Sequence, residues 1–298
     1  MTSALVFGDV SWAGGAAFNP IVFVHYMHCY VPGSFSSSDD RVANYRRDYL
    51  AAPTPPREVE SQWFAEDAEA TITGGLAAVQ ADLSRLAASH VDAVGLLIAP
   101  THLPNSQFAD ALNMVAQAAS ASTVKVIPEL WTDLRRADVD EYGREVARML
   151  AAHKGAQFEY QGKPVVLISE QAPDGGGSQA LAAAKERLDR LLRPWGGLAQ
   201  VYVIVNLGFG ETNIGANAYA ELADALGAWT PQDDWTSRRA EASGEAARTA
   251  GKPYVYPVSY GFYQRRAGSP PWEYGESFGA ARLIEAWAHA VAARPQFI

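Results

Sequence analysis

Two glutamates three residues apart stand in an aromatic segment near the carboxyl end of the sequence. Glu273 and Glu276 belong to PPWEYGESFGAARLIEAW, which begins at Pro270. Paired carboxyl groups are typical of sites that cleave glycosidic bonds, where one protonates the leaving oxygen and the other activates water or attacks. The simpler interpretation, which we favour for Glu276, is a carboxylate at a helix start, where the helix dipole stabilises negative charge.

Two further glutamates close apolar segments. Glu129 ends the run VKVIPE, and Glu170 directly follows PVVLIS. A carboxylate at the end of a buried strand costs free energy unless it is paired or used in chemistry. We therefore interpret Glu129, Glu170 and Glu273 as candidate catalytic carboxyl groups. The alternative for Glu129 is a salt bridge with Arg135 or Arg136.

The elements that would position these residues alternate between strand and helix. Short apolar runs, typical of strands buried on both faces, cover 21–27, 92–100, 124–131, 164–169, 201–206, 226–229 and 254–260. Amphipathic helical patterns separate most of them. We therefore predict an α/β fold with a parallel sheet, a (β/α)8 TIM-like barrel over residues 21–298 behind an N-terminal extension over 1–20. A doubly wound sheet is the rival, but no G-x-G-x-x-G follows the first run.

The eighth strand of this barrel is the least complete part of the prediction. The last three residues, QFI, have the pattern of a strand that begins at Gln296. An open barrel leaves two unpaired edges, which proteins avoid. We therefore expect an eighth strand that is truncated or completed by another segment: the N-terminal ALVFGDVSW, a further chain, or a missing C-terminal segment.

Aromatic and polar residues gather where the predicted strands end. Barrel sites lie at the carboxyl ends of the strands. Aromatic rings offer a large apolar face with one polar group, which suits a sugar ring. We expect a polysaccharide or oligosaccharide to bind there. The candidate substrate-binding residues are His25, Tyr26, Trp131, Asn206, Trp229, Tyr260 and Trp272.

Composition excludes several other partners. The formal net charge is −9, which argues against nucleic acid and anionic membrane surfaces. No apolar run is long enough to span a membrane, so we expect no membrane insertion. The N-terminus lacks the positive start of a signal peptide. His25, His28 and Cys29 cluster in HYMHC, but the two histidines point to opposite faces of a strand. We expect neither a metal nor a cofactor.

Four segments together resemble a known family. They are IVFVHYMHCY, NYRRDYLAAP, VDAVGLLI and YPVSYGFYQRR followed by PWEYGESFGAARLIEAW. Their order is similar to that in family 71 of the glycoside hydrolases, the α-1,3-glucanases, particularly its bacterial members. The resemblance implies an extracellular or cell-surface enzyme of carbohydrate metabolism that cleaves an α-1,3-glucan by an inverting two-carboxylate mechanism. It places Glu273 in a loop that reaches the site.

The sequence departs from this family in one respect that concerns catalysis. The family's acid pair is similar to D-x-x-E within T-W-N-D-Y-x-E on strand eight, and that motif is absent here. Tyr260 and Gly261 also replace a Pro-Gln pair. The alternative to a hydrolase is therefore a catalytically inactive barrel that binds carbohydrate or serves a structural role in a surface or viral tail assembly.

Overall fold

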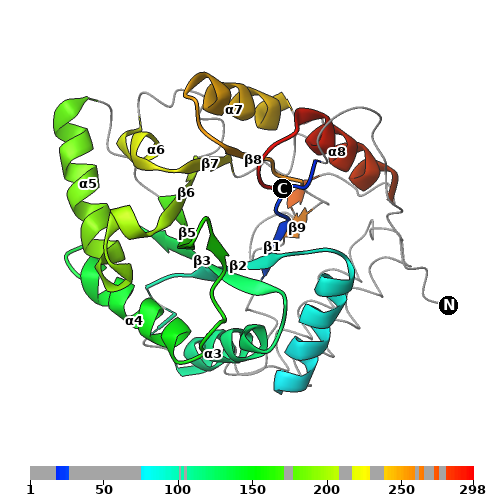
Figure 1. Cartoon of the computed structure of the whole chain (residues 1–298), viewed down its shortest axis with the longest axis horizontal. Coiled ribbons are helices and arrows are strands. Elements are labelled where there is room, and N and C mark those ends of the chain that lie inside the picture. The colour runs from blue at the N-terminus through cyan, green and yellow to red at the C-terminus, as the bar shows by residue number, and fades with distance from the viewer. Residues whose placement is uncertain are drawn as a thin grey trace.

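A parallel sheet rolled into a barrel and surrounded by helices forms the body of the protein (Figure 1). The computed structural model describes residues 18–26, 75–100, 102–103, 106–170, 177–207, 217–228, 238–258, 262–264, 272–274 and 280–298. Seven strands lie side by side and parallel in chain order: β1 (Phe23–Tyr26), β2 (Ala93–Ile98), β3 (Lys125–Thr132), β5 (Lys163–Glu170), β6 (Tyr202–Leu207), β7 (Ala225–Ala228) and β8 (Tyr254–Val255). The predicted α/β class and strand–helix alternation are confirmed.

Helices follow most strands and lie outside the ring (Figure 1). They are a helix over 75–88, α3 (Ser106–Ser120), α4 (Val139–Ala151), α5 (Ser178–Leu192), the 3₁₀ turns η3 (Arg193–Trp195) and η4 (Leu198–Gln200), α6 (Ala218–Leu222), α7 (Arg238–Thr249) and α8 (Ala280–Ala293). One core lies between these helices and the outer face of the strands. Such a two-layer arrangement buries one face of each helix, as the amphipathic patterns predict.

The last residues of the chain close the ring between β8 and β1. Phe297 forms parallel bridges to Ile21 on one side and Val255 on the other. The backbone N–H of Ile298 donates to the carbonyl of Ile21 at 2.9 Å, and the N–H of Tyr256 donates to Phe297 at 2.9 Å. The prediction that QFI forms the start of an eighth strand is thus confirmed. The N-terminal ALVFGDVSW, an alternative for this position, lies outside the described residues.

The amino-terminal half of the barrel interior is filled by apolar side chains. A second core, separate from the helix-facing one, contains Ala93, Ile127, Val165, Leu167, Tyr202, Ile204, Ala225, Val255 and Phe297. Around β4 (Glu159–Tyr160), which pairs antiparallel with β5, the rings of Tyr160 and Tyr202 meet edge to face with centroids 4.9 Å apart. Tyr160 also contacts Phe297 at 5.3 Å. Because this end is packed, polar side chains inside the barrel are confined to positions further along the strands.

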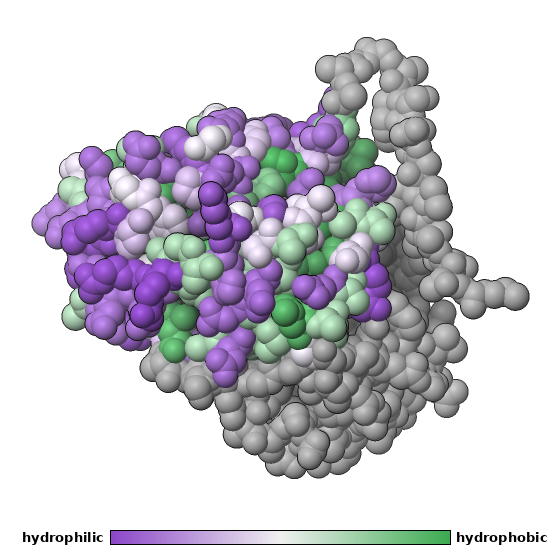
Figure 2. Space-filling model, turned by 60° about the horizontal axis from the view of Figure 1, so that its bottom comes forward, coloured by the Kyte–Doolittle hydropathy of each residue, from purple (hydrophilic) through white to green (hydrophobic). Residues whose placement is uncertain are grey.

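The connection from β8 to α8 carries a small hairpin that the sequence did not predict as strands. β9 (Phe262–Gln264) pairs antiparallel with β10 (Trp272–Tyr274). A connection that leaves the carboxyl end of a barrel strand belongs to the end where barrel sites form. On the face shown in Figure 2, polar residues predominate and apolar ones are scattered among them. No helix within the described part is long and apolar enough to cross a membrane.

Candidate functional site

A carboxylate buried inside the barrel is the centre of the candidate site. Glu129 on β3 is only 2% exposed, although it is charged in its ordinary state. Its Oε2 lies 2.7 Å from Nδ1 of His25 on β1, and its Oε1 accepts a hydrogen bond from the Ser169 hydroxyl on β5 at 2.8 Å. A buried carboxylate is tolerated when such donors replace its water. The structure thus brings Glu129 and His25, both predicted as site residues, into direct contact.

Asn206 on β6 extends this contact by one residue. Its Nδ2 lies 3.2 Å from the Ser169 hydroxyl oxygen. Since an amide nitrogen can only donate, the Ser169 oxygen accepts from Asn206, and its own hydrogen is directed to Glu129. All donors in the row therefore point toward the carboxylate. Four strands contribute to this His25–Glu129–Ser169–Asn206 network, and it spans the inside of the barrel.

The register of the strands explains why these residues meet. Ser169 is paired with Trp131 on one side and Asn206 on the other, and Asn206 is paired with Gly227 on β7. Paired residues in a sheet lie at one level and point to the same face. Glu129 and Trp131 are two residues apart on β3, so they also share a face. On this face of β3, Trp131 follows Glu129 toward the carboxyl end of the strand, and it is 44% exposed.

Two glycines leave space for the network. A Cβ built on Gly227 would overlap the Oδ1 of Asn206 and would stand 3.5 Å from the Cβ of Val255. A Cβ on Gly95 of β2, which lies between β1 and β3, would stand 3.8 Å from the Oε2 of Glu129. Glycine inside a strand often marks a close approach of another group. A glycine within an apolar run was therefore the sequence signal that could have pointed to Gly95 and Gly227.

Tyr26 lies on the opposite side of β1 from His25. Its hydroxyl donates to Oδ2 of Asp82, on the helix over 75–88, at 3.0 Å, and its ring packs in the helix-facing core. Burial, with a smaller contribution from Asp82, raises the pKa of the Tyr26 hydroxyl well above its ordinary value. The expectation that Tyr26 contacts substrate beside His25 does not fit this placement, because successive strand residues face opposite ways.

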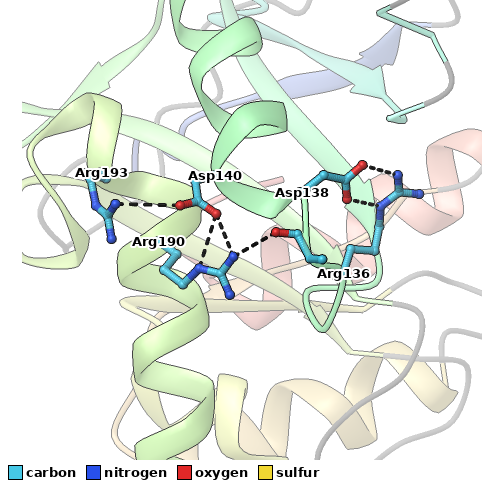
Figure 3. Close-up of polar contacts among 6 residues, drawn as sticks. Arg136, Asp138, Asp140, Arg190 and Arg193 are labelled. Carbon is cyan, nitrogen blue, oxygen red and sulfur yellow. Dashed lines mark hydrogen bonds and ion pairs between the residues drawn. The ribbon is translucent and has the colours of Figure 1, made fainter.

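Glu129 is not paired with the nearby arginines that the alternative interpretation named. Arg135 forms a bidentate contact with Asp133 at 2.8 and 2.9 Å, and this hydrogen bonding lowers the pKa of Asp133. Arg136 pairs in the same way with Asp138 at 2.6 and 2.9 Å (Figure 3). The two arginines thus form ion pairs with aspartates on the β3–α4 connection.

A second set of charged residues joins α4 to α5 on the outside of the barrel. Arg190 donates to Asp140 at 2.6 Å and to the carbonyl of Ala137 at 3.0 Å, and Arg193 lies 3.6 Å from Asp140 (Figure 3). The hydrogen bond from Arg190 lowers the pKa of Asp140. Next to these residues, a Cβ on Gly143 would overlap the backbone carbonyl of Leu191. This region belongs to helix packing rather than to the candidate site.

Other predicted positions lie at the carboxyl ends of the strands or outside the described part. His102, after β2, accepts from the N–H of Ala99 through Nδ1 at 3.1 Å, and burial lowers its pKa. Glu170 is the last residue of β5, where it pairs with Thr132, while Trp272 and Glu273 lie on β10. The side chains of these last three predicted residues are not described, and Trp229, Tyr260, His28 and Cys29 lie outside the described residues.

Ser169 is the residue of this network that the sequence indicated only weakly. It follows an apolar run directly, as a polar residue at the end of a strand. The sequence favours its neighbour Glu170 as the candidate, because a carboxylate has more catalytic roles than a hydroxyl. The residue of β5 that contacts Glu129 is nevertheless Ser169. Among the described residues, no group of three or more His, Cys, Asp or Glu side chains is arranged to hold a metal ion.

The fold is similar to that of a glycoside hydrolase. Two structures of the GH99 endo-α-mannosidase from Bacteroides thetaiotaomicron superpose on 76% of this chain with a TM-score of 0.56. The first, a complex with bis-tris propane, has 13% sequence identity over 70% of that chain. The second has 12% identity over 66% of that chain. Similarity at this level of identity concerns the fold, a TIM-like (β/α)8 barrel.

Sequence comparison adds no family to this structural class. No protein-family model matches the chain. No curated protein matches it either. The comparisons therefore support a glycoside-hydrolase-like barrel in general, and family 71 in particular stays a proposal.

Proposed function

We propose that the protein is a glycoside hydrolase that acts on a polysaccharide at the carboxyl end of its barrel. The observation that carries this proposal is the buried Glu129 at the centre of the His25–Glu129–Ser169–Asn206 network, below the exposed ring of Trp131. A carboxylate, hydrogen-bonding groups and an exposed indole at one end of a barrel suit a sugar ring and its hydroxyls. The fold it shares with an endo-α-mannosidase supports the same class of reaction.

The acid and base of such a reaction are proposed to come from the carboxylates singled out in the sequence. Glu129 lies inside the barrel, Glu170 ends the neighbouring strand β5, and Glu273 lies on β10 in the connection after β8. Inversion requires the two carboxyl groups roughly 6.5–9.5 Å apart, with room for a water. We propose Glu273 as one member of this pair, and Trp229, Tyr260 and Trp272 as sugar contacts from the same end.

The substrate class is proposed from two sources. The resemblance to family 71 points to an α-1,3-glucan, and the neighbouring structures are named as endo-α-mannosidases. The two candidate substrates, an α-1,3-glucan and an α-linked mannan, are both α-linked glycans, so the test compares them. Purified protein is incubated with insoluble α-1,3-glucan and with α-linked mannan, and new reducing ends are measured. Release from one of them, lost in Glu273→Gln, is the expected result.

Two further results distinguish the alternatives. The anomer of the first product, read by proton NMR, is expected to be inverted. Trp131→Ala is expected to weaken saccharide binding by about tenfold, equivalent to about 1.4 kcal/mol, without loss of folding, because the ring is 44% exposed. Binding of either glycan with no turnover would instead support the carbohydrate-binding barrel. Neither binding nor turnover would refute the carbohydrate proposal.

A further inference from the structure

We infer that Ser169 is a positioning residue for Asn206: its oxygen holds the Asn206 amide by Nδ2, so that Oδ1 is the atom offered to a hydroxyl group of the bound sugar. This inference deepens the proposed function and rests on it for the identity of the ligand. It gives Ser169 a role in recognition, and it gives the contact between Asn206 and sugar a direction. Asn206 accepts a hydrogen bond from the sugar through Oδ1.

The direction of the hydrogen bonds fixes the Asn206 amide. The buried carboxylate of Glu129 can only accept, so the hydrogen of the Ser169 hydroxyl is directed to Oε1 at 2.8 Å. The Ser169 oxygen is then an acceptor, and the Asn206 atom 3.2 Å away from it is the donor Nδ2. With the amide reversed, the Asn206 oxygen would compete with Glu129 for the one hydrogen of Ser169. A buried carboxylate would then lose a donor, which is the less stable arrangement.

The Asn206 oxygen is consequently turned toward β7. It occupies the place where a Cβ of residue 227 would stand, and glycine at that position admits it. Asn206 is half-buried, and within the described part of the chain its hydrogen-bond partner is Ser169 alone. Its Oδ1 is not one of the described polar atoms that are completely buried without a partner. Oδ1 is therefore an acceptor that a molecule bound in the barrel can reach.

The level of Asn206 in the barrel suits contact with a saccharide. The residues paired at this level on β3, β5, β6 and β7 are Trp131, Ser169, Asn206 and Gly227. Trp131 and Asn206 are two strands apart, about 9–10 Å, and the small side chain of Ser169 lies between them. A sugar ring that stacks on the exposed indole would extend across Ser169 toward Oδ1. Each free hydroxyl of that sugar carries a hydrogen that Oδ1 can accept.

The orientation of the amide can be measured without a ligand. The whole chain is labelled with ¹⁵N-asparagine, and the Asn206 side-chain signals are assigned by their loss in Asn206→Ala. We expect nuclear Overhauser effects from the Nδ2 hydrogens that are stronger to the β hydrogens of Ser169 than to the α hydrogens of Gly227. Effects that are equal, or stronger to Gly227, would overturn the inference.

Ser169→Ala tests the cause of that orientation. Without the acceptor oxygen the amide is no longer held on the β5 side, so we expect its hydrogens to give effects to both β5 and β7. Asn217 is the internal control, because its Oδ1 accepts from the backbone N–H of Tyr219 at 3.0 Å and of Ala220 at 3.3 Å, and its signals should stay constant. An unchanged orientation in Ser169→Ala would refute the positioning role. If Ser169→Ala does not fold, the wild-type effects still decide the orientation in either direction.

A titration then tests the contact with sugar. α-1,3-linked glucose oligosaccharides, and separately α-linked mannose oligosaccharides, are added to the labelled protein. We expect the side-chain signals of Asn206 to shift and those of Asn217 to stay constant. In calorimetry, Asn206→Ala is expected to weaken binding by about tenfold, as the loss of one hydrogen bond predicts. Asn113→Ala, which alters an asparagine that donates to the carbonyl of Ala109 within α3, is the matched control and should bind as the wild type does.

The outcomes separate this inference from the proposed function. Saccharide binding without a shift at Asn206, and with full affinity in Asn206→Ala, would refute the inference and leave the proposed function in place. No binding of either saccharide would refute the carbohydrate assignment in both. The Overhauser effects of the free protein would still report how the amide is oriented.

Discussion

Replacement of Gly227 by alanine tests the packing of the network directly. The added Cβ would overlap the Oδ1 of Asn206 and stand 3.5 Å from the Cβ of Val255. Gly227 is paired on both sides within the sheet, so neither β6 nor β8 can withdraw easily. We therefore expect the side chain of Asn206 to move and its hydrogen bond to Ser169 to break.

The magnitude follows from these two effects. Overpacking a filled interior costs about 1–3 kcal/mol. The loss of one hydrogen bond contributes about 1 kcal/mol of that change in the free energy of unfolding. The backbone of Gly227 itself adds no penalty, because it is not among the described glycines with positive φ. We expect Gly227→Ala to lower the free energy of unfolding by about 1–3 kcal/mol.

A double-mutant cycle identifies the source of this loss. Urea unfolding is measured for Gly227→Ala, Asn206→Ala and the double variant. If the new methyl group collides with Asn206, the Gly227→Ala change costs less than about 0.5 kcal/mol once Asn206 is shortened. The coupling energy then lies in the range of about 0.5–3 kcal/mol that contacting residues show. Equal costs of Gly227→Ala in both backgrounds would refute the reasoning.

Three further predictions concern stability. Gly143→Ala is expected to destabilise the protein by about 1–3 kcal/mol, because its Cβ would overlap the carbonyl of Leu191 and separate α4 from α5. This cost exceeds the gain from the better helix propensity of alanine. Thermal unfolding measures the change, and an unchanged midpoint would contradict it. Asp140, whose pKa is lowered by Arg190, contributes stability that is present above the ordinary aspartate pKa of about 3.9 and is lost as the pH falls through the lower folded value. Asp140→Asn should therefore flatten the acid side of the stability curve in urea unfolding between about pH 2.5 and 6, and an equally steep curve would exclude this role. Tyr26, whose pKa is raised chiefly by burial, contributes stability that is present below the ordinary tyrosine pKa of about 10 and is lost as the pH rises above it. Tyr26→Phe should cost about 1 kcal/mol at neutral pH through the lost bond to Asp82, yet lose less stability than the wild type above pH 10, which circular dichroism at alkaline pH can follow.

The strands were predictable because a barrel strand is buried on both faces. The run predicted over 124–131 is β3, Lys125–Thr132, and the run predicted over 201–206 is β6, Tyr202–Leu207. Such strands read as continuous apolar segments, which local sequence reveals. The hairpin of β9 and β10 was missed. Its strands are three residues each, too short for a pattern of alternation to show.

The candidate site was predictable as a region but not as a set of contacts. Residues at the ends of parallel strands converge in any barrel, so His25, Glu129, Trp131 and Asn206 could be proposed together. Which partner each one finds depends on register, and register joins residues far apart in the chain. The observed register pairs Glu129 with Leu167 and Trp131 with Ser169, so Ser169 lies on the same face as Glu129, one step further toward the carboxyl end, and contacts it there.

The amino-acid sequence by itself therefore determined the order of the elements, their alternation and the chemical character of the end where the strands stop. Those properties depend on the local pattern of apolar side chains, which each segment carries on its own. Only the tertiary structure decided that Tyr26 faces a helix while His25 faces the barrel interior. It also decided that Arg135 pairs with Asp133 and that Phe297 bridges the first and last strands of the barrel. These outcomes depend on which strand lies next to which and at what level, a property of the assembled sheet that no single segment contains.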